Sequence, residues 1–138
     1  VVGIAASGRT PYVVGALNQA RKHGLLTGCV TCNPDSLVVG ACDHPIVAVT
    51  GPEFVTGSTR MKAGTATKLL LNRLTTAAMI RLGHVQGNRM VDMQLSNAKL
   101  VERGSRMVSD ATGLNMAEAE ALLLSHGSVR AAVAAHKD

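Results

Sequence analysis

A short run of small and polar residues near the start of the chain has the composition of an anion-binding loop. Ser7, Gly8, Arg9 and Thr10 follow one another directly. The hydroxyl groups of Ser7 and Thr10 can donate hydrogen bonds to phosphate oxygens, and Arg9 carries a full positive charge. Gly8 lets the backbone approach a ligand closely. These four residues predict a phosphate-binding loop; the alternative is an ordinary turn between a strand and a helix, with Thr10 as its cap.

The segments on either side would place this loop at the start of a helix. Val1–Ala5 is a nearly continuous apolar run, which predicts a parallel strand buried on both faces. Pro11 suits the first helical position because its missing N–H would have no partner there, and Thr10 stands at the N-cap. Free amides and the helix dipole attract anions at such a terminus. Because the Walker and G-x-G-x-x-G patterns are both missing, a small phosphorylated metabolite is favoured over a nucleotide.

The order of the expected elements indicates a parallel α/β layer followed by a helical module. Helix and strand patterns alternate up to about residue 50, and a long helix is expected from Ser58 to about Leu82, with an apolar second half that predicts burial on most faces. An irregular segment His84–Leu95, with a turn at Gly87-Asn88, is expected to follow it, and then three short helices. The first of these is Ala98–Thr112, ending at Gly113; Asn115 and Glu118 form a capping box that opens the second, and the last runs to about His136. We expect one domain over residues 1–95 and a small UBA-like helical module over residues 96–138. Before the long helix, the sequence predicts a helix at Pro11–His23, strands at Leu26–Cys32 and about Pro45–Val49, and one helical turn within Leu37–Cys42.

A second group of candidate residues lies in and after the loop Gly51–Gly57. Glu53 follows the third expected strand, at the edge of the sheet where α/β proteins bind ligands. It could accept a hydrogen bond from a sugar hydroxyl or act as an auxiliary base; the alternative is a solvated loop carboxylate. One carboxylate alone cannot supply both the acid and the base of an elimination. Ser58 and Thr59 are expected to cap the long helix, and they could also contact a substrate.

Composition excludes several classes of function. One Tyr, one Phe and no Trp argue against nucleic-acid modules that stack bases on aromatic rings. The net charge of +5 is scattered along the chain, which favours small anionic ligands. We expect no membrane segment, free thiols and a cytoplasmic location. Cys29 and Cys32 have C-x-x-C spacing but no second pair, so they are interpreted as core thiols, and no metal site is expected.

Long segments in consistent order resemble the N-acetylmuramic acid 6-phosphate etherases of the SIS phosphosugar-binding superfamily. This resemblance implies a five-stranded parallel sheet between helices, of which about three strands are present here, and a C-terminal three-helix module. It also implies a homodimer with sites near the subunit interface. The matching segments read GIAASGRTPYV, CNPDS, GPEFVTGSTRMKAGTATKLLLN, and GNRMVDMQLSNAKL followed by DATG.

The resemblance also implies a reaction. In this family a base removes the C2 proton of the sugar phosphate, D-lactate leaves from C3, and water adds back, without a metal or organic cofactor. Both acid/base glutamates of the family lie upstream of the position equivalent to Val1, so we expect this chain alone to be inactive, with Glu53 as no more than an auxiliary. The alternative is a non-catalytic phosphosugar-binding regulator of the glucokinase regulatory protein type. Two further carboxylates in the cleft would discriminate the enzyme from the regulator.

Overall fold

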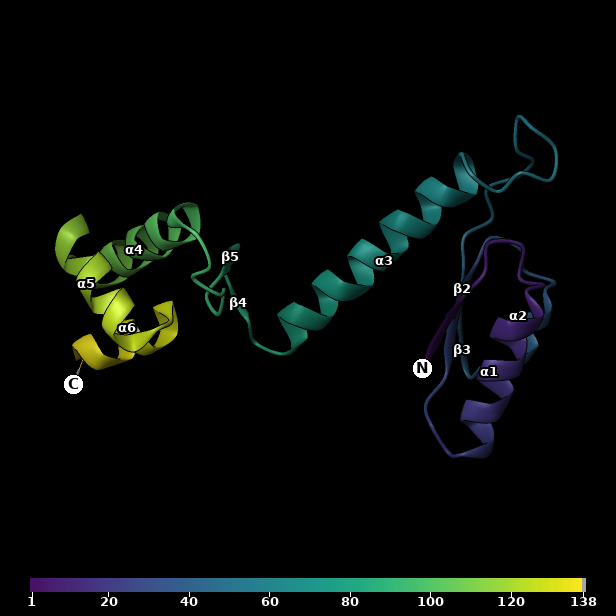
Figure 1. Cartoon of the computed structure of the whole chain (residues 1–138), viewed down its shortest axis with the longest axis horizontal. Coiled ribbons are helices and arrows are strands. Elements are labelled where there is room, and N and C mark those ends of the chain that lie inside the picture. Colours follow the sequence, from purple (N-terminus) through teal and green to yellow (C-terminus); the bar gives the residue numbers. More distant parts are fainter. Residues whose placement is uncertain (138) are drawn as a thin grey trace. The chain divides into compact units, whose positions relative to one another are not determined.

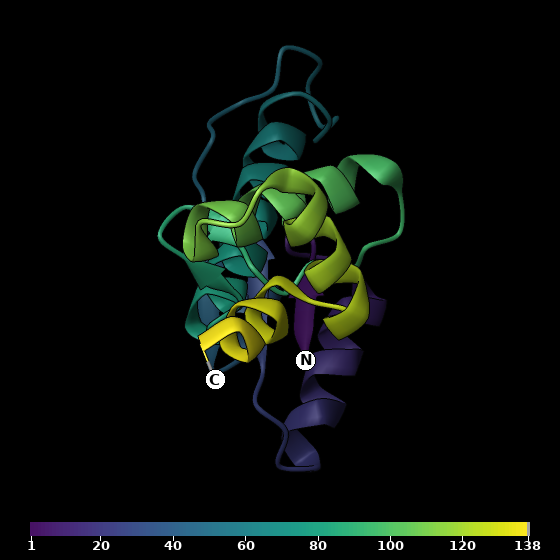
Figure 2. The same ribbon diagram turned by 90° about the vertical axis from the view of Figure 1, so that its left-hand side faces the viewer.

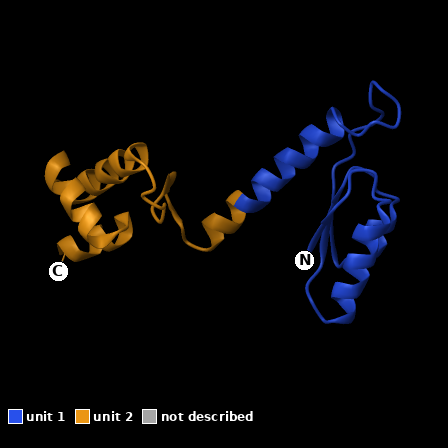
Figure 3. Cartoon of the chain, in the orientation of Figure 1, with its two compact units in different colours: residues 1–75 blue, residues 76–138 orange. Residues whose placement is uncertain are grey.

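The computed structural model describes residues 1–137 and contains two compact units (Figures 1 and 3). The first unit is Val1–Thr75, and the second begins at Thr76, so the division falls within helix α3 (Lys62–Arg81). Among the described residues, no helix is long and apolar enough to cross a membrane.

The first unit contains a three-stranded parallel sheet with two helices on one face. Strands β1 (Val2–Ile4), β2 (Gly28–Thr31) and β3 (His44–Val47) lie side by side in that order. Helices α1 (Pro11–Lys22) and α2 (Leu37–Gly40) connect them and pack on the same side (Figure 1). The strand–helix–strand order predicted from the sequence is confirmed, although each strand is shorter than expected. The core beneath the helices consists of Ala5, Leu17, Cys29, Val38, Ala41 and Cys42.

The opposite face of this sheet is largely uncovered, so the prediction that β1 is buried on both faces is wrong. Gly3 points toward α1, where an added Cβ would lie 2.7 Å from Val13 Cγ1. Val2 and Ile4 point the other way and are 49% and 45% exposed. Alternate residues of a strand face opposite sides, and α1 and α2 cover only one of them. Leu74 borders a shallow groove on the open face but does not close it.

Helix α3 differs from its prediction in the residue at which it begins and in the exposure of its second half. It begins at Lys62, four residues after the expected start at Ser58. Its second half is exposed rather than buried, with Leu74 39% and Ile80 53% exposed. An apolar sequence can only be buried where another element covers it, and the described residues supply no such cover for this half of the helix.

The second unit is a three-helix cluster preceded by a small hairpin (Figures 1 and 2). Strands β4 (Val85–Gln86) and β5 (Arg89–Met90) pair antiparallel across the Gly87–Asn88 turn, where the sequence predicts only an irregular segment. Helices α4 (Ala98–Thr112), α5 (Met116–His126) and α6 (Val129–Lys137) follow. Their shared core consists of Val91, Met107, Val108, Ala119, Leu123, Val129 and Ala132.

The ends of these helices agree closely with the sequence. Asn115 accepts the Glu118 amide at 3.0 Å while the Glu118 carboxylate accepts the Asn115 amide at 3.1 Å, which is the predicted capping box. Gly113 ends α4 with a φ of 79°, in the left-handed region that glycine favours.

The α/β class with a partial parallel sheet and a C-terminal helical module is confirmed, and it is consistent with part of a SIS-type sandwich. The domain boundary near residue 95 stays a prediction.

Candidate functional site

The predicted phosphate loop connects the end of β1 to the start of α1 at the carboxyl edge of the sheet. Ser7, Arg9 and Thr10 are exposed, whereas Gly8 is buried. Pro11 is the first residue of α1, as the sequence predicts, and Thr10 occupies the N-cap. The structure therefore brings together the four residues that composition singled out, on the open side of a helix N-terminus.

Residues that the sequence argument did not assign to the site hold this loop in place. Cys32 N–H donates to the Ala6 carbonyl at 2.9 Å, and Thr31 Oγ1 donates to the same carbonyl at 3.2 Å. Asn33 Nδ2 reaches the Ser7 carbonyl at 3.4 Å. All three donors come from the end of β2 and the turn after it. The CNPDS turn was the available signal, because an Asn at a strand end commonly bonds to neighbouring backbone.

Gly8 is the point of closest approach between the loop and this turn. Its φ of 68° lies in the left-handed region, and a Cβ added there would overlap the Oγ and Cβ of Ser36. Ser36 is itself fixed, since its hydroxyl donates to the Asn33 carbonyl at 2.8 Å. Gly8 is therefore required by both backbone conformation and space, whatever its role toward a ligand.

The polar groups on the outer side of the loop are left available. The Thr10 side chain makes no capping hydrogen bond, contrary to the alternative in which it merely caps the turn. The Thr10 carbonyl accepts the Val13 and Val14 amides at 3.0 and 3.1 Å, so its backbone starts the helix while its hydroxyl does not. A hydroxyl pair, a guanidinium and the positive end of α1 can thus face an anion.

Glu53 makes a contact that the sequence argument missed: it caps helix α3. Its Oε1 accepts the Ala63 amide at 3.0 Å and its Oε2 accepts the Lys62 amide at 3.1 Å. These hydrogen bonds, that of Ala63 foremost, hold the pKa of the Glu53 carboxyl below its ordinary value. The prediction that Ser58 and Thr59 cap the helix is wrong, because a carboxylate ten residues upstream of Ala63 satisfies the first amides instead.

Ser58 and Thr59 lie in the turn just before α3. The Ser58 amide donates to Val55 at 3.0 Å and the Arg60 amide donates to the Ser58 carbonyl at 2.9 Å. The start of α3 is anchored beside the sheet, since Cys32 Sγ lies 3.8 Å from the buried Ala63 carbonyl. Cys32 also holds the phosphate loop through Ala6, so the loop and the capped start of α3 belong to the same edge of the sheet.

The groups at this edge are of the kinds that can bind an anion. Two helix starts, Arg9 and several hydroxyls are present, but Glu53 is the only one of the predicted site residues that carries a carboxylate. Among the described residues, no group of His, Cys, Asp and Glu has the arrangement of a metal site. Burial, with the neighbouring Cys42 thiol, raises the pKa of Cys29 to about 11, which makes it an inert core thiol.

The chain is similar to several known proteins. Residues 87–133 match the C-terminal lid domain of glucokinase regulatory protein. A protein of Bacteroides fragilis named N-acetylmuramic acid 6-phosphate etherase is 58% identical over 99% of this chain, which covers 49% of that relative. Proteins of the same name from Christiangramia forsetii and Symbiobacterium thermophilum are both 59% identical, over 100% and 98% of the chain and 50% and 45% of their own lengths.

The fold defines an α/β protein with a glycine-containing loop and a helix N-terminus at the carboxyl edge of a parallel sheet, followed by a helical module. The chain spans about half the length of the curated relatives it matches. Over nearly its whole length it is a relative of the N-acetylmuramic acid 6-phosphate etherases and corresponds to their C-terminal half. The resemblance that its motifs indicate is confirmed.

Proposed function

We propose that this chain forms the C-terminal half of an N-acetylmuramic acid 6-phosphate etherase. Such a lyase cleaves the lactyl ether of its substrate to give N-acetylglucosamine 6-phosphate and D-lactate, in the recycling of cell-wall amino sugars. The observation that carries this proposal is the identity of 58 to 59% to proteins of that name over nearly the entire chain. A cytoplasmic homodimer, in a SIS-type arrangement, is part of the proposal.

The loop Ser7–Thr10 is the proposed contact for the sugar phosphate. The support for this proposal is geometric. Thr31, Cys32 and Asn33 donate hydrogen bonds to the carbonyls of Ala6 and Ser7, so the loop is held in place without hydrogen bonds from the Ser7 and Thr10 hydroxyls. A rigid loop loses little conformational freedom when it binds a ligand. Ser58 and Thr59, in the turn before α3, are proposed to contact the sugar.

The elimination needs a base for the C2 proton and an acid for the leaving oxygen. Glu53 does not suit the acid role, because its lowered pKa leaves it ionised at neutral pH. It therefore cannot supply both roles, and each of its oxygens already accepts a hydrogen bond from a backbone amide. It can still accept a sugar hydroxyl. The acid/base pair is therefore proposed to come from residues outside this chain, and residues 1–138 alone are proposed to be inactive. Proton transfer and C–O cleavage of this kind call for no metal or organic cofactor.

A second candidate is a phosphosugar-binding regulator without catalytic activity. The observation that favours it is the match of residues 87–133 to the lid domain of glucokinase regulatory protein. Such a protein would keep the anion-binding loop and lack the acid/base pair altogether.

One experiment tests whether this chain can complete a functional etherase. Residues 1–138 are tested alone and joined to the remaining half of the Bacteroides fragilis relative, with D-lactate release and calorimetric binding measured for N-acetylmuramic acid 6-phosphate. An etherase predicts lactate release by the joined protein and none by the chain alone. Binding without release by a folded joined protein would support the regulator. No binding by the joined protein would contradict both candidates.

A further inference from the structure

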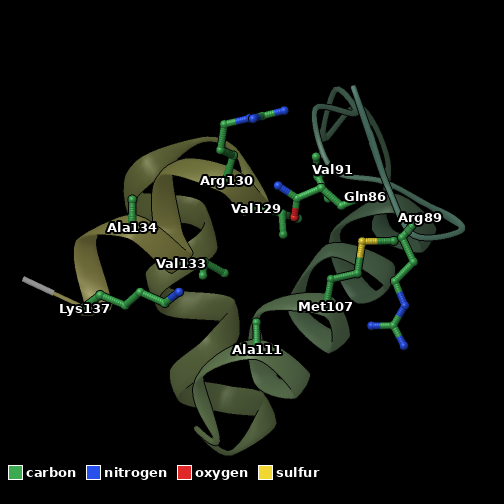
Figure 4. A pocket seen from close by; sticks show the side chains of 10 residues that line it. All are labelled: Gln86, Arg89, Val91, Met107, Ala111, Val129, Arg130, Val133, Ala134 and Lys137. Atoms are coloured by element: carbon green, nitrogen blue, oxygen red, sulfur yellow. The ribbon is translucent and has the colours of Figure 1, made fainter. Parts of the chain in front are cut away.

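The second unit contains a cavity of about 380 Å³ between the β4–β5 hairpin, α4 and α6 (Figure 4). This volume is within the range of small-molecule sites. Its floor is part of the core, since Val91, Met107 and Val129 are only 5%, 7% and 4% exposed. The floor is therefore formed before any ligand arrives, and the flexible Met107 can adjust to its shape. The remaining apolar walls are Ala111, Val133 and Ala134.

Within residues 1–137, the part of the chain that the structure describes, the charged side chains that line this cavity are all cationic. They are Arg89, Arg130 and Lys137, and no carboxylate of these residues lines it. Two of these charges are already balanced: Arg89 lies 2.6 Å from Asp110 Oδ2, and Arg130 lies 2.8 Å from Asp92 Oδ2. These two carboxylates leave one positive charge, that of Lys137, for which residues 1–137 offer no ion-pair partner.

The directions of the lining side chains agree with Lys137 being the one cation left to face the cavity. Figure 4 shows the guanidinium groups of Arg89 and Arg130 turned away from the centre of the cavity. The Lys137 amine and the Gln86 amide point into it (Figure 4). The cavity thus presents one cation and one amide above apolar walls.

We propose that this cavity binds a small amphiphilic monocarboxylate, a medium-length alkyl chain ending in a single carboxylate. The walls favour the alkyl chain by burial of apolar surface. Lys137 and Gln86 would donate to the carboxylate. A phosphate dianion would bring a second negative charge that one lysine does not balance, and burial of unpaired charge is costly. The proposal concerns residues separate from the phosphate loop and does not depend on the proposed function.

In the first test, the 138-residue chain is titrated with butanoate, hexanoate and octanoate. Binding is monitored through the backbone amide signals in NMR spectra. Affinity is expected to rise about fourfold for each added CH₂ while the chain fits the cavity. Shifts are expected in α4, α6 and the hairpin. Octylammonium has the same chain with the opposite charge and is expected to bind far more weakly. Equal affinity for octylammonium, or shifts centred elsewhere, would overturn the proposal.

The second test uses a matched pair of variants on helix α6. Ala134→Leu fills the cavity and is expected to abolish octanoate binding, whereas Ala131→Leu places the same side chain at an exposed position that does not line it. Lys137→Gln is expected to weaken octanoate about tenfold and to leave the neutral 1-octanol unchanged. Unaltered helicity in circular dichroism spectra checks the fold of each variant. Equal effects of the two Leu variants, or no effect of Lys137→Gln, would refute the assignment.

Discussion

Glu53 Oε1 accepts the amide N–H of Ala63 at 3.0 Å, so a carboxylate in the loop after β3 sets the first turn of α3. The second oxygen binds the neighbouring Lys62 amide in the same way. Helix starts leave several amides without intrahelical partners, and here one side chain satisfies two of them. The loop and the helix are therefore a single structural piece.

Replacing Glu53 is expected to loosen the start of α3. In Glu53→Ala the amides of Lys62 and Ala63 lose their acceptor, and their hydrogen exchange should accelerate about fivefold, as for loss of a typical cap. Glu53→Gln keeps one acceptor oxygen, so its exchange rates should lie between those of the parent chain and those of Glu53→Ala. Exchange measured by NMR in the centre of α4 serves as the internal control. Unchanged protection of Ala63 in Glu53→Ala would contradict the capping role.

The same contact predicts a pH dependence. The pKa of Glu53 is lowered in the folded chain from an ordinary value of 4.5, so the unfolded state binds this proton more readily. The stabilisation is fully present above about pH 4.5 and is lost as the pH falls through the lowered value. Urea denaturation at several pH values should show this loss in the parent chain. A pH profile identical in Glu53→Ala would show that another group is responsible.

Gly8 and Gly24 form a matched pair for separating backbone strain from steric overlap. Both have positive φ, 68° and 69°, but an added Cβ overlaps Ser36 at Gly8 and meets nothing within 4 Å at Gly24. Gly24→Ala should cost about 1–2 kcal/mol from the left-handed conformation. Gly8→Ala should cost about 1–3 kcal/mol more, since the Ser36 turn must move as well. Urea denaturation measures both costs, and equal values would mean that the turn yields freely.

The hydroxyls of the phosphate loop are expected to matter for binding and not for folding. Ser7→Ala combined with Thr10→Ala removes two donors that no described residue uses, so affinity for N-acetylmuramic acid 6-phosphate should fall about tenfold in the joined protein. Ser125→Ala, at an exposed position of α5, is the control. Calorimetry gives the affinity and circular dichroism the fold. Undiminished affinity in the correctly folded double variant would remove the loop from the site.

The open face of the sheet is expected to make residues 1–138 associate. Val2 and Ile4 stand about half exposed on a parallel sheet, and such sheets are normally covered on both faces. Light scattering should show dimers or larger species, and Ile4→Lys should shift the population toward monomer. Lys in place of Leu124, which is 55% exposed on α5, provides a comparison away from the sheet. A stable monomer of the parent chain would refute this expectation.

Several features were predictable from the sequence because their causes are local. The Asn115–Glu118 capping box, the end of α4 at Gly113 and the start of α1 at Pro11 each depend on residues within one helical turn. The position of the Ser7–Thr10 loop was predictable for the same reason, since a strand, a glycine and a helix start follow one another directly. The order and type of the elements follow from such local signals.

Burial and long-range contacts were not predictable in this way. The apolar residues of β1 and of the second half of α3 read as core, but only a covering element can bury them, and their sequence does not say whether one is present. The support of the loop by Thr31 and Asn33, and the capping of α3 by Glu53, join residues that are brought together by the parallel sheet. The sequence alone therefore determined which local pieces form, because backbone preferences and caps act over a few residues. Only the tertiary structure decided which side chains meet and which stay exposed, because those outcomes depend on distant segments packing against one another.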